Sequence, residues 1–532
     1  GVYIRFASDR GLGLTVSDRG VVAIAEAMSW GPVETVQEIE AGANMTPYTG
    51  YDITNPKNRF LNEIFKGTNR TAAPNKLLLY RLGATGQKQA SAEVSPLTAT
   101  AKYPGVRGND ISIVITELTD PEDAFAVSTV VGGEIVDQQT AKTVEELSAN
   151  DWVAWSGTGA LAATVGKALS GGADGSPASA DYTDFLAAIE PYKFDVLIYD
   201  GADTTVQDAM VAFVKRLAAE EGAYTQLVAA GLTNPDDRFV VNIMSGVVLS
   251  DGTALTPQQV TWWAGGALAG AQYNESLTYA AYPNAVDVSP KLTNSGYIDA
   301  LTAGQFVLFA DDGVVKVEQD INSLVTYTTD ITGPYHKNRV IRLLNTVAND
   351  IYQQFSDGYI GSVNNNEQGR MMFKSAIVGY LLDIQANNGI QNFEAEDVTV
   401  EPGEAIDAIV VNLAIQPVDS VEKIYDYKLG TETDAATGKS EAAVLPKSNM
   451  IYYQLADGAW FLVRPSGTEP KIKFYLGVKG NSQEDAAEQL VDIGVILDHQ
   501  NVACHALCLP LVSIVGVFLY YTAPAGTFLN FL

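Results

Sequence analysis

Apolar runs of strand length alternate with amphipathic helical stretches in the middle of the chain. Phe194–Tyr199 and Leu227–Ala230 are such runs, and between them Asp203 offers a helix N-cap, followed by apolar side chains at helical spacing up to Leu217. Pro257 opens a further helix. Strands that are apolar throughout and alternate with helices predict a parallel sheet covered on both faces.

The two segments before this region differ in pattern. In residues 1–90, the apolar runs Val21–Ala25 and Leu77–Tyr80 enclose a helix that Asn55-Pro56 opens, which predicts mixed α/β structure. Residues 91–178 instead carry short apolar strands between turn-rich polar pieces, at 111–115, 125–127 and 152–155. This spacing predicts a small antiparallel β-sandwich or barrel.

Beyond residue 305, the pattern predicts a hairpin, two helices and a strand. Asp311-Asp312-Gly313 is a strong hairpin turn, and amphipathic helices follow around Val340–Ile351 and Phe373–Ile384. The strand Ile409–Gln416 then places four apolar side chains on one face, namely Ile409, Val411, Leu413 and Ile415. A strand with such a face needs a sheet partner.

The composition is that of a globular protein with a strongly acidic surface. Of 532 residues, 47% are hydrophobic and 18% are charged, and the net charge is −30. Such a surface repels phosphate backbones and anionic lipids, so we expect no nucleic acid and no membrane as partners. The apolar run Ala506–Tyr521 contains Pro510 and is shorter than the roughly 20 residues of a spanning helix, which favours a buried tail over an anchor.

Side chains for catalysis or metal binding are sparse. His336 has no nucleophile motif near it, which favours a capping or interface role. Asp200 and Asp203 follow a predicted strand, where doubly wound sheets bind ligands, but a turn acid and a helix cap explain them more simply. The Cys504-His505 pair with Cys508 supplies only three close zinc ligands. We therefore expect no catalytic residue, no metal and no cofactor.

One motif is long and specific, and it runs from Arg464 to Lys473 with the sequence Arg-Pro-Ser-Gly-Thr-Glu-Pro-Lys-Ile-Lys. The Arg464 guanidinium can fork onto two phosphate oxygens, and Ser466, Thr468 and the backbone at Gly467 can supply further donors. The motif predicts a phosphate-binding loop in a separate unit of the chain.

Several stretches of the first 425 residues occur in a characteristic order. They are Gly1–Ile4 with Ser17–Gly20, Trp30–Pro32, Tyr103–Asp110, Ala264–Asn274 with Ser276–Thr278, Asp320–Leu324, Arg339–Tyr359, and Ala408–Gln416 with Val421–Tyr425. Together they resemble the contractile tail sheath proteins of bacteriophages and related contractile injection systems. That family usually has a short arm before the first of these stretches, and this sequence starts at the stretch itself.

This resemblance implies a structural protein of the virion and not an enzyme. The implied assembly is a homo-oligomeric helical sheath, with stacked hexameric rings, which surrounds an inner tail tube and contracts to drive it through the target cell envelope. Baseplate and tail terminator proteins are the other implied partners, and the implied location is the virion tail, assembled in the bacterial host cytoplasm. Terminal arms of such sheaths add strands to neighbours, so we expect Ile409–Gln416 to be exchanged between subunits or to complete a sheet at a subunit junction.

A second resemblance covers residues 422–490. The stretches Val421–Gly430, Leu445–Ser448, Asp457–Trp460 and Arg464–Tyr475 resemble the C-terminal domain of phosphoglucomutase/phosphomannomutase enzymes. By this resemblance, Arg464, Ser466, Gly467 and Thr468 bind a sugar phosphate. The phosphoserine loop and the Asp-rich metal loop of those enzymes are missing from the sequence. The alternative to a sheath subunit is therefore a phosphohexomutase-related enzyme or a sugar-phosphate-binding fusion.

Together these patterns predict a multidomain protein of α/β and α+β type. The expected segments are an α/β N-terminal sheath segment at 1–90, a β-rich protruding domain (sandwich or barrel) at 91–178, a subtilisin-like α/β sheath domain without a working triad at 179–310, an α+β C-terminal sheath assembly domain at 311–425, a small α+β domain like the phosphohexomutase C-terminal domain at 426–500, and an unassigned apolar tail at 501–532.

Overall fold

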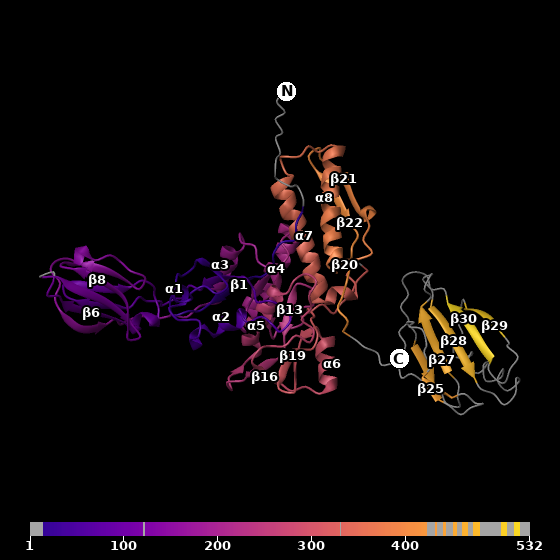
Figure 1. The fold of residues 1–532 in the computed structure, drawn as a ribbon, viewed down its shortest axis with the longest axis horizontal. Coiled ribbons are helices and arrows are strands. Elements are labelled where there is room, and N and C mark those ends of the chain that lie inside the picture. Colours follow the sequence, from indigo (N-terminus) through magenta and orange to yellow (C-terminus); the bar gives the residue numbers. More distant parts are fainter. Residues whose placement is uncertain are drawn as a thin grey trace, which may run out of the picture. The chain divides into compact units, whose positions relative to one another are not determined.

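The computed structural model describes residues 14–120, 123–329 and 331–422 with their side chains, and the backbones of seven strands beyond Glu422. Contacts divide the chain into two compact units, Gly1–Glu422 and Lys423–Leu532. The first unit combines a large mixed sheet, a two-sheet sandwich and a helical hairpin (Figure 1). The protein therefore has a mixed α/β multidomain fold, as the sequence predicts.

A seven-stranded sheet forms the centre of the first unit. Its order is β17-β13-β12-β11-β1-β3-β2, and all neighbours are parallel except β2 and β3. The strands are β1 Val21–Glu26, β2 Val36–Glu40, β3 Lys76–Arg81, β11 Val196–Ile198, β12 Gln226–Ala230, β13 Val240–Ile243 and β17 Gln305–Phe306. Because β1 pairs with both β3 and β11, the segments expected at 1–90 and 179–310 share one sheet.

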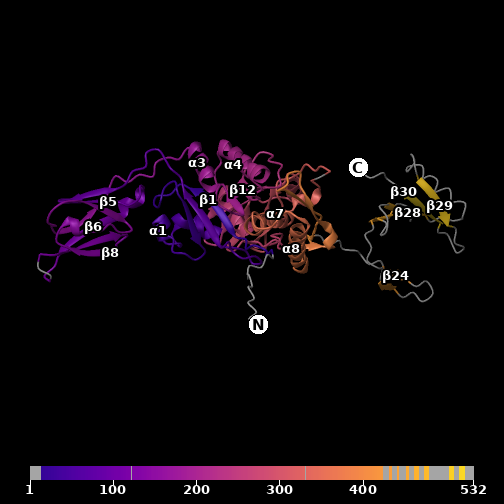
Figure 2. The same ribbon diagram turned by 90° about the horizontal axis from the view of Figure 1, so that it is seen from above.

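Helices cover both faces of this sheet, as its apolar strands predict. One face packs against α2 (Arg59–Ile64) and α5 (Pro257–Gly270), and the other against α3 (Ser179–Ile189) and α4 (Thr204–Arg216), which lie above β1 and β12 in Figure 2. Short helical turns at α1 (Thr46–Thr49) and Pro56–Asn58 precede α2. Asp203 caps α4 as predicted, because its Oδ1 accepts a hydrogen bond from the Thr205 N–H at 2.8 Å. The predicted apolar stripe of α4 and the turn after it is buried: Val206, Met210, Phe213 and Leu217.

The residues between β3 and α3 form an antiparallel sandwich, which confirms that prediction. One sheet has the order β10-β6-β7-β8 and the other β4-β5-β9. The strands are β4 Ser91–Val94, β5 Leu97–Ala101, β6 Ile111–Glu117, β7 Phe125–Val131, β8 Glu134–Ala141, β9 Val153–Gly157 and β10 Thr164–Ala168. Inward-facing side chains of both sheets, such as Ala99 and Ile113, fill one core.

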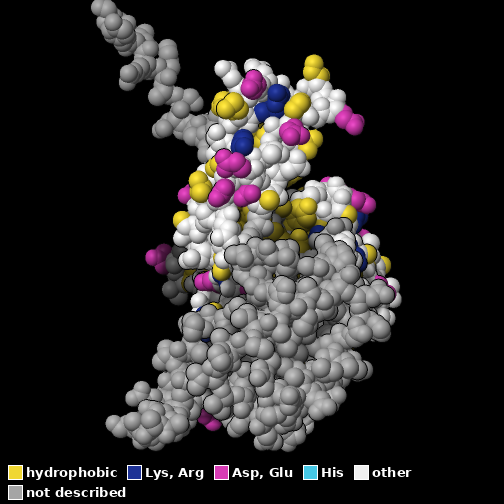
Figure 3. Space-filling model, turned by 90° about the vertical axis from the view of Figure 1, so that its right-hand side faces the viewer, with side chains coloured by type: hydrophobic (Ala, Val, Ile, Leu, Met, Phe, Trp, Pro, Cys, Tyr) yellow, Lys and Arg dark blue, Asp and Glu magenta, His cyan; other side chains and the backbone are white. Residues whose placement is uncertain are grey.

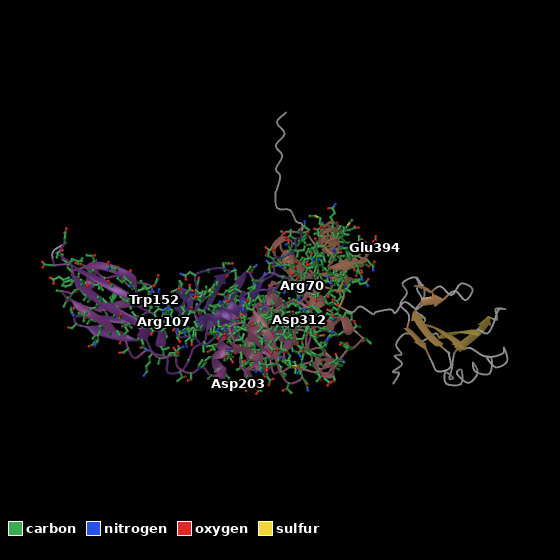
Figure 4. All side chains as sticks on the ribbon, turned by 60° about the horizontal axis from the view of Figure 1, so that its bottom comes forward. Arg70, Arg107, Trp152, Asp203, Asp312 and Glu394 are labelled. Carbon is green, nitrogen blue, oxygen red and sulfur yellow. The ribbon has the colours of Figure 1, made fainter. Side chains whose placement is uncertain are left out.

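Arginines join the sandwich to the central sheet. Arg81, the last residue of β3, donates to the carbonyl oxygens of Gly31 at 2.7 Å and Pro104 at 2.8 Å. We call these three residues the joint. Beside it, Arg107 Nε donates to the carbonyl oxygen of Gly50 at 2.9 Å, and its guanidinium lies 5.6 Å from the centre of the Trp152 ring (Figure 4). Since carbonyl oxygens are fixed points of the backbone, these contacts hold the two domains at defined positions.

The predicted hairpin and helices are present in the rest of the first unit. The hairpin is β18 (Leu308–Asp311) with β19 (Val314–Val317), and its turn residues Asp312 and Gly313 have φ values of 49° and 76°, as a type I′ turn requires. The long helices are α7 (Asn338–Gly358) and α8 (Glu367–Ala386). The remaining elements are β14 Gly246–Leu249, β15 Ala254–Leu255, β16 Ala285–Ser289, α6 Asn294–Thr302, β20 Ile390–Gln391, β21 Val398–Pro402, β22 Ile409–Leu413 and β23 Gln416–Pro417.

The second unit contains one five-stranded sheet of order β26-β27-β28-β30-β29 and the separate pair β24-β25. The strands are β24 Thr431–Thr433, β25 Ser440–Ala442, β26 Ile451–Gln454, β27 Trp460–Pro465, β28 Ile472–Val478, β29 Val502–Leu507 and β30 Val515–Tyr521. Strands β29 and β30 come from the segment expected as an unassigned tail, and β30 pairs with β28. A helix that the sequence predicts from about Gln483 lies outside the described residues.

Close packing of α5 on α2 makes the first testable prediction. A Cβ on Gly266 would lie 2.0 Å from the carbonyl oxygen of Ile64, so Gly266→Ala must push the two helices apart. We expect it to lower the free energy of unfolding by about 2–4 kcal/mol, measured by denaturant titration. The control is Gly379→Ala on α8, where a Cβ meets nothing within 4 Å. That change should stabilise the protein by about 0.5–1 kcal/mol, because alanine favours helix.

Candidate assembly surface

The predicted apolar strand near residue 413 forms a β-hairpin within its own chain. β22 pairs with β21 in an antiparallel ladder from Val398↔Leu413 to Pro402↔Ile409. Three of the four predicted apolar side chains, Ile409, Val411 and Ile415, pack against the core formed with α7 and α8, whereas Leu413 is 37% exposed. The face that carries Ile409, Val411 and Ile415 thus turns toward the chain's own helices, and Leu413 does not pack with them.

Hydrogen bonding leaves one edge of β22 open. The N–H of Ala414 donates to the carbonyl of Asp397, so the N–H groups of Asn412 and Val410 point toward β21 as well. The N–H groups of Val411 and Leu413 then point the other way, because successive residues of a strand alternate. Among the described residues, no strand pairs with this side of β22, which we call the open edge.

The outer edge of β21 is a poorer template for strand pairing. Pro402 has no N–H, so this edge lacks one donor where β22 has its full set.

The surface around the open edge is acidic. Residues 391–418 carry six acidic and no basic side chains. Figure 3, which faces this side of the first unit, shows more acidic than basic side chains over the helical hairpin. The open edge therefore lies in a negatively charged part of the surface.

Contacts on both sides of β22 hold it in its own chain. Before the strand, Asn365 donates from its side-chain amide to the carbonyls of Ile406 and Ala408, at 2.9 and 2.8 Å. After it, β23 pairs with β20, and the N–H of Val418 donates to the carbonyl of Gly389. β22 is therefore fixed at both ends.

The first unit ends in a cluster that we call the clasp, formed by Glu422, Lys337 and Thr278. Glu422 is hydrogen-bonded to the Lys337 ammonium and accepts from the Thr278 hydroxyl at 2.7 Å. The Glu422 and Lys337 side chains are 8% and 19% exposed, so this is a largely buried ion pair. Burial raises the pKa of the neighbouring Asp419. The clasp fixes the last residues of the unit to the start of α7.

Buried polar contacts also attach α7 to the central sheet. Asp350 on α7 accepts from the N–H of Ser17 at 3.2 Å and from the hydroxyl of Tyr380 on α8 at 2.6 Å. Arg19 forms an ion pair with Asp195 at 3.0 Å, next to β11. The residues before β1 therefore bridge the sheet and the helical hairpin. Sequence patterns gave no sign of this, because polar side chains in a core have no periodicity.

The other candidates from the sequence have structural roles or lie outside the described side chains. His336 bonds through Nδ1 to the carbonyl of Leu324 in its own chain at 2.7 Å, and burial lowers its pKa. Arg464 lies on β27, of which only the backbone is described. Ser466, Gly467 and Thr468 lie outside the described residues. Within the described part of the chain, no three metal-binding side chains cluster, and no helix is long and apolar enough to cross a membrane.

Families of phage tail sheath domains match the chain in order along its length. The N-terminal region of tail sheath protein Gp18 domain III matches residues 19–82, the β-sandwich domain 84–174, the central domain 175–323 and the C-terminal domain 331–426. The phage-like element PBSX protein XkdK of Bacillus subtilis (strain 168) is 36% identical over 80% of this chain and 96% of its own length. The fold and these matches define a structural protein of contractile tails.

Solved structures agree with this classification. The sheath tail protein of Desulfitobacterium hafniense has a TM-score of 0.72 and 42% identity, covering 80% of this chain and 99% of that one. The sheath tail protein Lin1278 of Listeria innocua has a TM-score of 0.68 and 32% identity, covering 78% and 95%. The chain belongs to the phage tail sheath family.

A segment near the end of the chain matches a second family. The C-terminal domain of phosphoglucomutase/phosphomannomutase matches residues 417–493. A phosphoglucomutase of Staphylococcus saprophyticus is 41% identical over 69 residues, which are 12% of that enzyme. The two families overlap at residues 417–426, which confirms that the resemblances meet near the clasp.

The clasp generates the second prediction. Lys337→Met leaves the Glu422 carboxylate buried without its cation, which should release residues 414–422 at a cost of about 2 kcal/mol. Amide hydrogen exchange at Ala414 and Val418 should then be roughly 30-fold faster. The matched control is Lys291→Met, because Lys291 is 72% exposed in its pair with Asp287 and should change little. Unchanged exchange at both amides in Lys337→Met would show that the clasp does not hold this segment.

Proposed function

We propose that this chain is the repeating subunit of a helical sheath that surrounds an inner tail tube and contracts to drive the tube through the target cell envelope. Membership of the tail sheath family supports the role, and the open edge of β22 supports the mode of assembly. The proposed oligomer consists of stacked hexameric rings, with baseplate and tail terminator proteins at its ends. It belongs to the virion tail and assembles in the host cytoplasm.

The open edge makes β22 the receiving strand at the subunit junction. β22 is held at both ends by the Asn365 contacts and the β20–β23 pair, so donating it to a neighbour would break each of them. Receiving an extended segment from a neighbour breaks none and satisfies the free N–H groups of Val411 and Leu413. Of the two expectations from the sequence, completion of a sheet at the junction is therefore the one that we propose.

Polymerisation and contraction of a sheath require no catalysed reaction. The central sheet, for which we keep the subtilisin-like assignment as part of the proposal, acts as a rigid body, and the joint holds the sandwich to it. Paired strands at the junctions act as hinges when the lattice changes from its extended to its contracted form.

The open edge generates the third prediction. Leu413→Pro removes an N–H from the open edge but none from the β21–β22 ladder, and the Leu413 side chain is already 37% exposed. The subunit should therefore keep its melting temperature but fail to form tubes in electron micrographs. The matched change Asn412→Pro removes an N–H that points toward β21 and should lower the melting temperature as well.

Two outcomes would contradict the receiving role. Normal tubes from Leu413→Pro would show that the open edge is not part of the junction. A subunit whose melting temperature falls as far in Leu413→Pro as in Asn412→Pro would show that both N–H groups serve the subunit's own fold.

A sugar-phosphate-binding appendage is the second candidate function, and the family match at residues 417–493 supports it. In this proposal Arg464, Ser466, Gly467 and Thr468 bind the phosphate, as the sequence motif implies. Phosphoryl transfer needs more than a phosphate-binding site, because it also requires a nucleophile and a metal ion.

We therefore expect no phosphoglucomutase turnover, which is the fourth prediction. A coupled assay of the full chain with magnesium and the bisphosphate activator should give the rate of the enzyme-free blank. Turnover that disappears in Arg464→Ala would overturn the structural assignment of the second unit. Binding of glucose phosphate without turnover, measured by calorimetry and lost in Arg464→Ala, would support the appendage.

A further inference from the structure

Two carboxyl groups meet where the parallel strands of the central sheet end. Glu26 is the last residue of β1, and β1 pairs with β11 through Ile24↔Ile198. Two residues further along both strands bring Glu26 and Asp200 to matching positions on one face of the sheet, and each carboxyl group affects the pKa of the other. The indole Nε1 of Trp262 on α5 donates to Asp200 Oδ2 at 2.8 Å. The sequence pattern indicates Asp200 and Asp203 at this edge of the sheet but does not indicate Glu26.

A proton must hold this pair together. Two carboxylates at neighbouring positions repel each other, and an ionised carboxylate can only accept hydrogen bonds. Burial is the main cause that raises the pKa of Glu26 well above its usual value, and Asp200 raises it further. Burial also raises the pKa of Asp200, but the hydrogen bond from Trp262 opposes this change. Glu26 is therefore the protonated member, and Asp200 accepts its proton in a hydrogen bond.

Arg81 lies on the other side of Glu26. β1 and β3 pair in the register Glu26↔Arg81, and alternation places both side chains on the sheet face that carries Ile24 and Leu79. Glu26 Oε1 is buried and accepts no hydrogen bond from a described N–H or O–H group, and Arg81 Nε is buried and donates none. An unpaired acceptor and an unpaired donor thus occupy paired positions on neighbouring strands.

Two further cations, Arg59 and Lys57, line the same pocket as Glu26, and Lys57 is exposed to solvent. Arg59 forms its ion pair with Asp251, at 3.6 Å. Burial lowers the pKa of Arg81 to about 10, which still leaves it charged at neutral pH. The remaining titratable groups around the pair and its pocket of about 440 Å³ are Tyr182 on α3, Tyr199 and Asp203 beside β11, Tyr51 before α2, and Asp174 from the sandwich.

We propose that Glu26 is a proton-controlled contact that changes partner between Asp200 and Arg81. With its proton, Glu26 donates to Asp200. Without it, Glu26 is repelled by Asp200 and attracted by the guanidinium, so its carboxylate turns to accept from Arg81 Nε. The proton leaves to water through the pocket that Glu26 lines.

The change of partner reaches the sandwich through the joint. Arg81 already uses its two terminal nitrogens on the carbonyls of Gly31 and Pro104, so an acceptor on Nε completes its hydrogen bonding. At the same time Asp200 loses one of its two donors and keeps Trp262. A rise in pH therefore weakens the contact between β1 and β11 and strengthens the one that carries the sandwich.

The first test compares the full chain with its Glu26→Gln variant, whose amide still donates to Asp200 but cannot ionise. In the folded protein Glu26 keeps its proton at pH values where an unfolded glutamate has lost it, so unfolding releases one proton. Relative to the variant, the unfolding constant of the wild type should rise about tenfold per pH unit, from the usual glutamate pKa up to that of folded Glu26. The control Glu117→Gln, at the exposed end of β6, should show no such difference. Equal pH dependence of wild type and Glu26→Gln would overturn the proposal.

The second test uses infrared difference spectra over a pH titration. The wild type should show the carbonyl stretch of a protonated carboxylic acid at neutral pH, and Glu26→Gln should lack it. Asp200→Asn removes the repulsion and should shift the loss of this band to lower pH. Arg81→Lys has no Nε–H and should shift it to higher pH. An unshifted band in Asp200→Asn contradicts the shared proton, and an unshifted band in Arg81→Lys contradicts the change of partner. Asp200→Asn is close in shape to the native residue, so it decides the first point even if Arg81→Lys does not fold.

Discussion

The ion pair between Arg342 and Asp320 fixes the position of α7, and the assembly surface depends on that helix. The two side chains are 0% and 1% exposed and lie 3.0 Å apart. An unpaired charge at this depth would cost several kcal/mol, so neither side chain can leave without the other. Asp320 also accepts from the N–H of Leu277 and the side-chain amide of Asn338 at the start of α7. The loop, the helix start and the ion pair therefore hold one another in place.

The fixed position of α7 in turn determines where α8, β21 and the open edge of β22 lie. α7 meets α8 through a core that includes Leu343 and Phe373, and α8 packs on β21. β22 is the outermost element of this series, and its outer N–H groups have no partner strand among the described residues. An exposed edge invites unspecific pairing, which like charges on neighbouring copies suppress. Residues 391–418 carry six acidic and no basic side chains, which would repel the same surface of a neighbouring copy. A basic incoming segment would not be repelled.

The sequence predicted elements well where a local pattern defines them. The cap at Asp203, the stripe on α4 and the turn at Asp312-Gly313 each depend on residues within one or two turns of chain, and all are present. The pairing of β1 with β11 in one sheet was missed, because strand partners more than a hundred residues apart leave no local pattern. The clasp was missed for a related reason, since Glu422 and Lys337 are 85 residues apart. Of the two residues, only Glu422 lies in a stretch that carries the family resemblance, Val421–Tyr425, and a resemblance gives no pairing.

The two units of the chain meet at residues 422–423, and each is held together by its own contacts. Up to Glu422, the backbone is held by the clasp and by the N–H of Val418 on Gly389, so the last residues of the sheath unit belong to its fold. Beyond Lys423, the described strands pair with one another, in the β24–β25 pair and in the sheet from β26 to β29. Since neither set of described strand pairs uses the other, the sheath fold does not need the sheet of the second unit for its own ladders. The clasp is then the point at which the first unit ends, because among the described residues its ion pair is the last one along the chain before the strands beyond Lys423.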